Sequence, residues 1–376
     1  MTPINKSIHV FFSLVRAGLW EQDVQLAFWG QIDFNEVYRL AEEQSVVGLV
    51  AAGIEHVKDV KVPQEVALSF AGSALQLEQR NQAMNEFVAK LINKLRCQDV
   101  YALLVKGQGI AQCYERPLWR SCGDVDLLLS TGNYEKAKAY LTPQANSIDS
   151  EYAAEAHLSM MLKGYEVELH GTLHSRLSKK VDREIDAVQK DVFYGGNVRS
   201  WMNGKTSVFL PSPNNDVIFV FTHILKHFFI EGIGLRQICD WCRLLWKYKD
   251  SLNHGLLESR IRKMGLMTEW KAFASFAVEY LGMPKEAMPL YNVKSKKDDV
   301  IWKKKADRIM EFVLKTGNFG HNRERKTYSS YFGGKLASTF RKLKDFGHHM
   351  RLFPIDSVKF FCYFAIDGIG GAMRGE

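Results

Sequence analysis

The chain of 376 residues is longer than one compact hydrophobic core usually spans, so two or three structural units are expected. Its composition, 46% hydrophobic and 24% charged, excludes a mainly disordered or fibrous protein. A formal net charge of +8 favours an anionic partner, and nucleotide, nucleic acid and anionic lipid all remain open.

Neither a signal peptide nor a membrane-spanning segment is predicted. The first twenty residues lack an apolar run followed by a small-residue cleavage site, and they resemble an amphipathic helix. Even the apolar segment 217–235 is interrupted by charged and histidine side chains. Cys239 and Cys242 are expected to be buried thiols on a helix rather than a zinc or redox pair, in a reducing cytoplasm.

Four stretches follow one another along the chain. Helical spacing of apolar residues predicts an N-terminal helical unit over 1–96. Short apolar runs bounded by turn residues predict a mixed α/β core over 97–210. Prolines mark the start of a second helical unit over 211–290, and the basic, loop-rich region 291–376 is expected to be partly mobile. The order of these stretches predicts a mixed α/β core between helical units.

Asp124 and Asp126 interrupt an otherwise apolar strand. The period of two along a strand places both carboxylates on one face. Two such charges repel by about 4 kcal/mol at about 4 Å and an effective dielectric constant of about 20. The pair therefore requires a compensating cation. Mg²⁺ is suitable because it prefers oxygen ligands. A chance pair on a solvated strand end is the alternative. Arg120, four residues earlier, could contact a triphosphate, hold the carboxylates in place, or be a surface arginine.

Upstream, an apolar strand leads into the turn Lys106-Gly107-Gln108-Gly109 and then into a helix-like segment. This order can present backbone N–H groups to a phosphate, and glycine allows the backbone to approach the anion closely. The alternative is an ordinary tight turn. Lys106 could pair with phosphate or point into solvent.

The segment YEVELHG alternates like a strand and places Glu166, Glu168 and His170 on one face. If this strand lies beside the Asp124 strand, one glutamate supplies a third carboxylate, which can bind metal and accept a proton from an attacking hydroxyl. A solvent-facing edge strand is the alternative.

Two residue pairs in the following helices have i, i+4 spacing. His223 and His227 share one helix face and could line a cleft or bind a transition metal, although their aromatic neighbours also fit a packed core. Arg236 and Asp240 have the same spacing and could form an intrahelical ion pair.

Together these segments resemble the uncharacterised nucleotidyltransferase family of the polymerase-β superfamily, over about residues 30 to 280. The family shows a K-G-x-x-(apolar)-A turn and helix, an R-x-x-x-D-(apolar)-D-L-L strand and an acidic-(apolar)-H strand. The matching segments are Lys106–Ala111, Arg120–Leu128 and Glu168–His170, followed by H-x-x-x-H at 223–227 and L-R-x-(apolar)-x-D at 235–240.

The resemblance implies an α+β fold, with a small mixed sheet flanked by N-terminal and C-terminal helical units. It also implies that Asp124, Asp126 and Glu168 hold two magnesium ions while an acceptor hydroxyl attacks the α-phosphate of a nucleoside triphosphate. Two departures stand out: the usual Gly-Ser or Gly-Gly doublet is Gly107-Gln108, and the third acidic residue is glutamate rather than the commoner aspartate. The residues assigned to nucleotide or cofactor binding are Lys106, Gly107, Gln108, Gly109, Arg120, His170, His223, His227, Arg236 and Asp240.

The expected function is therefore magnesium-dependent nucleotidyl transfer to an unidentified hydroxyl acceptor. One alternative is a non-catalytic relative that binds a nucleotide or a partner, which splayed carboxylates would favour. The other is a polyanion-binding or membrane-surface protein, suggested by the basic and aromatic segment 338–364. A C-terminal helix docked on the body would explain the same segment.

Overall fold

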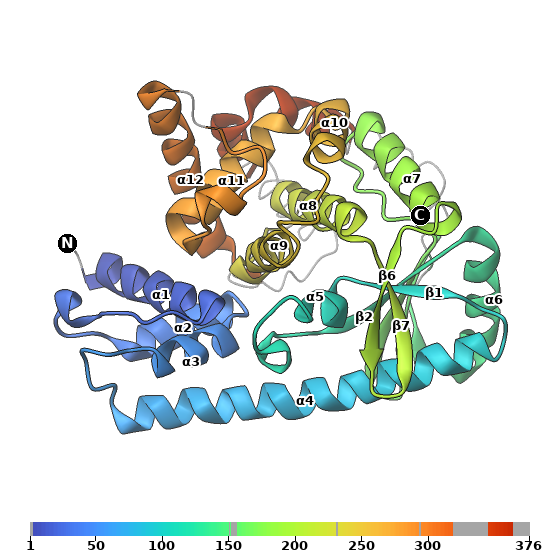
Figure 1. Cartoon of the computed structure of the whole chain (residues 1–376), viewed down its shortest axis with the longest axis horizontal. Helices are drawn as coiled ribbons and strands as arrows, with labels where there is room; N and C mark the ends of the chain where they lie inside the picture. The colour runs from blue at the N-terminus through green and yellow to red at the C-terminus, as the bar shows by residue number, and fades with distance from the viewer. Residues whose placement is uncertain are drawn as a thin grey trace, which may run out of the picture.

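Helices make up most of the molecule and surround one sheet of seven strands (Figure 1). The chain is described from a computed structural model. The described residues are 3–149, 151, 156–230, 232–292, 295–318 and 345–363.

The N-terminal part is helical, as the sequence predicts. Its helices are α1 (Pro3–Trp20), α2 (Phe34–Glu43), α3 (Val47–Glu55) and α4 (Gln64–Arg96). Helices α1 and α3 touch backbone to backbone, because a Cβ atom at Gly53 would collide with the carbonyl oxygen of Leu14. Helix α4 has 33 residues, about 50 Å at 1.5 Å per residue, and runs below both the N-terminal helices and the sheet in Figure 1.

The sheet is mixed, with strand order β3-β4-β5-β2-β1-β7-β6. Its strands are β1 (Ala102–Val105), β2 (Asp124–Leu129), β3 (Ser147–Ile148), β4 (His157–Leu162), β5 (Tyr165–His170), β6 (Val198–Asn203) and β7 (Thr206–Pro211). The predicted pairing of the two acidic strands is confirmed: β2 pairs with β5 in parallel, and Asp126 lies opposite Glu168. Strand β1 pairs with the other edge of β2 in antiparallel orientation.

Alternation along the strands gives the sheet an apolar face and a polar face, and the polar face also carries the buried side chains of Leu103, Val105 and Leu128. Val125, Leu127 and Leu169 are buried on the apolar face, against α4 and α6 (Thr131–Leu141). The residues between them along the strands point to the opposite face. The sheet is therefore held by a dry layer on one side while its acidic residues remain free to line a site on the other.

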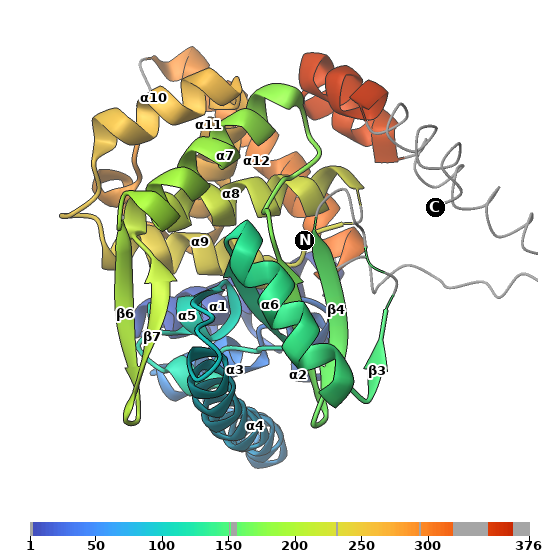
Figure 2. The same cartoon turned by 90° about the vertical axis from the view of Figure 1, so that its right-hand side faces the viewer.

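A second set of helices lies above the sheet in Figures 1 and 2. These are α7 (Lys179–Tyr194), α8 (Pro213–Ile230), α9 (Leu235–Lys247), α10 (His254–Met264), α11 (Met267–Leu281) and α12 (Lys296–Thr316). Their buried side chains form one hydrophobic cluster with those of α1–α3. The indole Nε1 of Trp20 also donates to the carbonyl oxygen of Leu281 at 2.6 Å. Helix α1 thus packs directly against the end of α11.

The expectation of a loop-rich region beyond residue 290 is wrong for much of that region. Residues 296–316 form α12, and 345–352 and 354–363 are also helical. In α12 the buried residues recur at helical spacing, and the high density of lysine and arginine hid that pattern in the sequence. Residues 319–344 and 364–376 lie outside the described residues.

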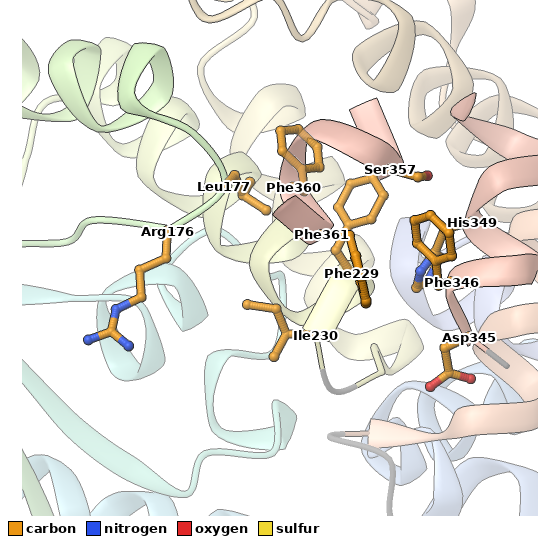
Figure 3. A pocket seen from close by; sticks show the side chains of 10 residues that line it. All are labelled: Arg176, Leu177, Phe229, Ile230, Asp345, Phe346, His349, Ser357, Phe360 and Phe361. Atoms are coloured by element: carbon orange, nitrogen blue, oxygen red, sulfur yellow. The ribbon is translucent and has the colours of Figure 1, made fainter. Parts of the chain in front are cut away.

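The described part of the basic C-terminal segment packs on the body. The Phe360 ring lies 4.7 Å from the Phe229 ring of α8, centroid to centroid (Figure 3). Phe353 is 1% exposed. These aromatic side chains are therefore used in internal packing, which favours the docked-helix interpretation over a membrane-surface role for residues 345–363. Across the described ranges, no helix combines the length and apolarity needed to cross a bilayer.

Candidate active site

A cavity of about 400 Å³ lies between the polar face of the sheet and helices α8 and α9. It is within the size range of small-molecule sites. Most of the residues predicted from sequence line it. They are Lys106, Gly107, Arg120, Asp124, Asp126, Glu168, His170, His223, His227, Arg236 and Asp240.

The three predicted carboxylates meet in this cavity. Oxygen atoms of Asp124, Asp126 and Glu168 all lie within 4.8 Å of one another. The geometry follows from the sheet, because Asp126 and Glu168 are register partners on adjacent strands and Asp124 lies two residues away on the same face. The carboxylates converge rather than splay.

The crowding of negative charge affects the pKa of Asp124. The charge of Asp126, followed by burial, raises the Asp124 pKa to about 6 against the partial compensation from Lys106. A divalent cation would relieve this repulsion, and a set of three carboxylates matches the hard oxygen ligands that Mg²⁺ prefers. The residues present therefore fit the implied metal.

Two basic side chains contact Asp126, which is only 1% exposed. Lys106 Nζ and His170 Nε2 each donate to Asp126 Oδ1 at 2.8 Å. Burial opposes the charged form of His170, but hydrogen bonds to Asp126 and Glu168 outweigh it and raise the His170 pKa. From the sequence, Lys106 could either pair with phosphate or point into solvent. In the structure it pairs with Asp126.

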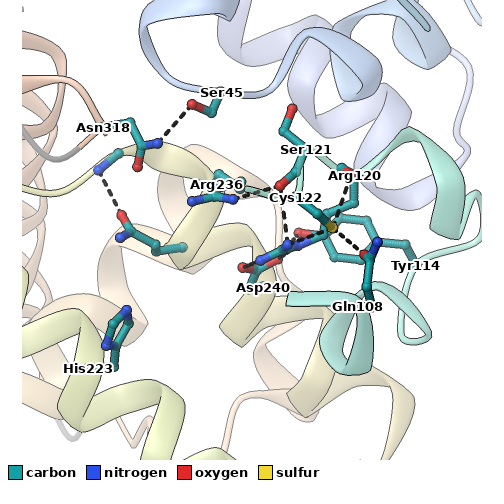
Figure 4. Close-up of polar contacts among 12 residues, drawn as sticks. Ser45, Gln108, Tyr114, Arg120, Ser121, Cys122, His223, Arg236, Asp240 and Asn318 are labelled. Carbon is teal, nitrogen blue, oxygen red and sulfur yellow. Dashed lines mark hydrogen bonds and ion pairs between the residues drawn. The ribbon is translucent and has the colours of Figure 1, made fainter. Parts of the chain in front are cut away.

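Arg120 and Asp240 form a buried ion pair with each other (Figure 4). Arg120 Nε lies 3.0 Å from Asp240 Oδ1 and Arg120 Nη2 lies 2.6 Å from Oδ2, while the Tyr114 hydroxyl donates to the same carboxylate at 2.7 Å. This corrects two predictions. Arg120 does not contact Asp124 or Asp126 through its guanidinium, and Asp240 pairs with Arg120 instead of Arg236.

Arg236 consequently has no carboxylate partner among the described ion pairs. Its Nη1 donates to the carbonyl oxygen of Ser121 at 2.6 Å (Figure 4), and its Nε is buried without a hydrogen-bond partner in the described part of the chain. Burial lowers the Arg236 pKa. An arginine so placed on a cavity wall can accept an anionic ligand at little further desolvation cost.

Two residues of the predicted glycine turn do not reach the cavity. The side-chain amide of Gln108 faces Asn81 of α4 and accepts from Cys122 Sγ, so it points away from the carboxylates. A Cβ atom at Gly109 would lie 2.8 Å from a methyl group of Leu210, so this glycine serves close packing against β7. Only Lys106 and Gly107 of the turn line the cavity.

His157 is a cavity residue that the sequence did not single out. It lies opposite His170 in the antiparallel β4–β5 pair, and its Nε2 lies 3.4 Å from Glu168 Oε2. The two-residue connection between the strands fixes this register, so the sequence did contain a signal for it. His223 and His227 also line the cavity, with their Nε2 atoms 3.1 Å apart.

Comparison with known proteins gives one match. The model of a family described as uncharacterised nucleotidyltransferase matches residues 30–282, which include every cavity residue named above. No curated protein and no solved structure matches the chain. Since the match covers more than half of the sequence, the chain belongs to this uncharacterised nucleotidyltransferase family.

Proposed function

We propose that the chain transfers a nucleoside monophosphate from a nucleoside triphosphate to a hydroxyl acceptor, in a magnesium-dependent reaction. Family membership supports nucleotidyl transfer as the general activity. The observation that carries the proposal is the convergence of Asp124, Asp126 and Glu168 within 4.8 Å in a cavity with cationic walls. Convergence also favours an enzyme over a non-catalytic relative.

The three carboxylates would hold the metal. When bound, Mg²⁺ supplies charge neutralisation at the reacting phosphate and acidifies an oxygen ligand. Arg236 and Lys226, on the opposite wall, are placed to bind phosphate oxygens electrostatically. Gly107 lies beside Asp124, where the absence of a side chain keeps room for a phosphate group.

In the reaction, the acceptor oxygen forms a bond to the α-phosphorus while the bond from that phosphorus to the bridging oxygen breaks and pyrophosphate leaves. The hydroxyl proton goes to a carboxylate. Burial disfavours the charged form of Glu168, but hydrogen bonds from His157 and His170 outweigh it and lower its pKa. The charge of Asp126 raises the Asp124 pKa to about 6 in the metal-free cluster, and Mg²⁺ bound beside Asp124 would favour its charged form and so its role as a metal ligand.

Calorimetric titration with ATP, GTP, CTP and UTP tests the proposal. At least one nucleotide is expected to bind in Mg²⁺ and to lose affinity in EDTA. Asp124→Asn and Asp126→Asn should each weaken this binding by at least about tenfold, because the metal loses a charged ligand. Glu258→Gln, on the exposed surface of α10, is the matched control.

Equal and metal-independent behaviour of all four proteins would reject the proposal. Circular dichroism of each variant separates loss of binding from loss of fold. If binding is found, incubation of the protein with α-labelled nucleotide and cell extract identifies the fraction that contains the acceptor.

A further inference from the structure

Histidine is concentrated around this cavity. Five of the eleven histidines in the chain line it: His157, His170, His174, His223 and His227. The carboxylate site alone would need only oxygen ligands for Mg²⁺. Imidazole nitrogen instead suits zinc and the neighbouring transition metals. The cavity therefore offers a donor type that the proposed magnesium chemistry does not use.

Two of the three spacings among the donor groups in this wall match those of a metal coordination shell. Glu168 Oε2 lies 3.1 Å from His170 Nε2 and 3.4 Å from His157 Nε2, and the three groups lie within 4.8 Å of one another. Ligand atoms bonded at about 2.1 Å, at tetrahedral or right angles, lie about 3.0–3.4 Å apart. Both spacings to Glu168 fall in that range.

The β4–β5 pair holds these three side chains in place. His157 and His170 are directly opposite in the antiparallel register, with ring centroids 4.8 Å apart and planes inclined by 29°. Glu168 projects from the same face two residues before His170. Ligands on paired strands are more rigidly placed than ligands on loops.

We propose that His157, Glu168 and His170 form a second divalent-metal site, which takes a nitrogen-preferring ion such as Zn²⁺. Three protein ligands leave a coordination position for water or a substrate oxygen, as in catalytic zinc sites. The site shares Glu168 with the proposed magnesium site, but its existence does not depend on nucleotidyl transfer. Binding of the ion by His170 Nε2 would break the hydrogen bond from His170 to Asp126. Lys106, at 2.8 Å from Asp126, would continue to balance the charge of that carboxylate.

His223 and His227 provide an internal comparison on the opposite wall. Their Nε2 atoms are 3.1 Å apart, which also suits two ligands of one ion. Within the described residues, however, the groups of three or more possible ligands contain His157, Glu168 and His170 but neither histidine of α8. A variant at His223 therefore changes a cavity histidine without removing a ligand of the proposed site.

The test is titration of the metal-free, full-length protein with Co²⁺, followed by competition with Zn²⁺. Cys97→Ser and Cys362→Ser form the background, because these two thiols are exposed and would bind the same ions. We expect a saturable site with the visible absorption of nitrogen-ligated Co²⁺. His157→Gln and His170→Gln should each weaken it by at least about tenfold, whereas His223→Gln should leave it unchanged.

An unchanged Co²⁺ affinity and spectrum in His157→Gln would overturn the proposal, as would a loss confined to His223→Gln. His157 is 24% exposed, so its replacement puts little of the fold at risk. Nucleotide binding in Mg²⁺, measured on the same variants, separates the two hypotheses. Loss of Co²⁺ binding in His157→Gln supports the nitrogen site even if no nucleotide binds; retained Co²⁺ binding overturns it even if Asp124→Asn abolishes nucleotide binding.

Discussion

Among single residues, Asp240 joins two parts of the fold that lie far apart in sequence. It accepts hydrogen bonds from Arg120, before β2, and from Tyr114, after α5 (Gly107–Ala111), although it belongs to α9. The Arg120 and Asp240 side chains are 5% and 7% exposed. A buried arginine whose carboxylate is removed keeps its charge but loses its compensation.

Asp240→Asn is therefore expected to lower the free energy of unfolding by about 3–5 kcal/mol. Urea denaturation followed by circular dichroism measures the change. The exposed Arg262–Glu258 pair of α10 supplies the control, since Glu258→Gln should cost less than about 0.5 kcal/mol. A small loss in Asp240→Asn, similar to the control, would contradict a structural role for the buried pair.

Glu269 is a second buried acidic residue, and its pKa is shifted upward, whereas a salt bridge lowers the pKa of a carboxylate. It is 0% exposed in α11, and neither carboxyl oxygen has a hydrogen-bond donor among the described residues. Burial first, and then the charge of Asp356, raise its pKa well above the ordinary 4.5. Burial and the neighbouring Asp356 of the 354–363 helix thus both favour the protonated form of Glu269 in the fold.

The pKa of Glu269 is higher in the folded state than in the unfolded chain. Its protonated form therefore contributes its full stabilisation below pH 4.5, and this contribution is lost as the pH rises through the folded-state pKa. Glu269→Gln keeps a donor at this place and removes the titration. We expect urea denaturation across a pH series to show a smaller loss of stability toward alkaline pH in the variant than in the unchanged chain. Parallel losses in both proteins would argue against this assignment.

For strands and helices, local periodicity decided how much of the site could be predicted. The faces of Asp124, Asp126 and Glu168 follow from a period of two, so the sequence placed all three correctly once β2 and β5 were taken as neighbours. The pairing of Arg120 with Asp240 spans 120 residues and leaves no periodic signal. The same holds for Lys106 and Asp126, whose contact depends on how β1 and β2 are aligned.

The packing of α1 on α3 depends on glycine. Gly53→Ala would drive a methyl group into the Leu14 carbonyl, so the helices must separate. We expect a loss of about 1–3 kcal/mol or more in the free energy of unfolding. Gly72→Ala in α4 is the matched control: nothing lies within 4 Å of its Cβ position, so alanine should be neutral or stabilise by about 0.5–1 kcal/mol. Equal effects on thermal unfolding would contradict this.

For the whole molecule, helices of the N-terminal and C-terminal parts of the chain share one hydrophobic cluster. Trp20 and Arg16 of α1 donate to backbone carbonyls at the end of α11, and the side chains around them are continuous with those of α8 and α12. The N-terminal and C-terminal helices, which the sequence divides into separate stretches, therefore have no separate cores.

The full-length protein is accordingly expected to unfold in urea with one cooperative transition. Tryptophan fluorescence would monitor this unfolding. Separately produced fragments 1–96 and 97–376 should each lack a cooperative transition, because each exposes its part of the shared core. Two resolved transitions in the full chain, or a cooperative transition in either fragment, would contradict this expectation.

Strand β2 is hydrogen-bonded along both of its edges, to β1 and to β5. Its backbone cannot move toward a ligand without breaking the hydrogen bonds to both neighbouring strands, so the wall of the cavity that carries Asp124 and Asp126 is rigid. If the cavity narrows around a ligand, the movement is expected in the opposite wall, which α8 and α9 form. A fluorescent reporter on α8 would then register occupancy, whereas the same reporter beneath β2 would stay silent.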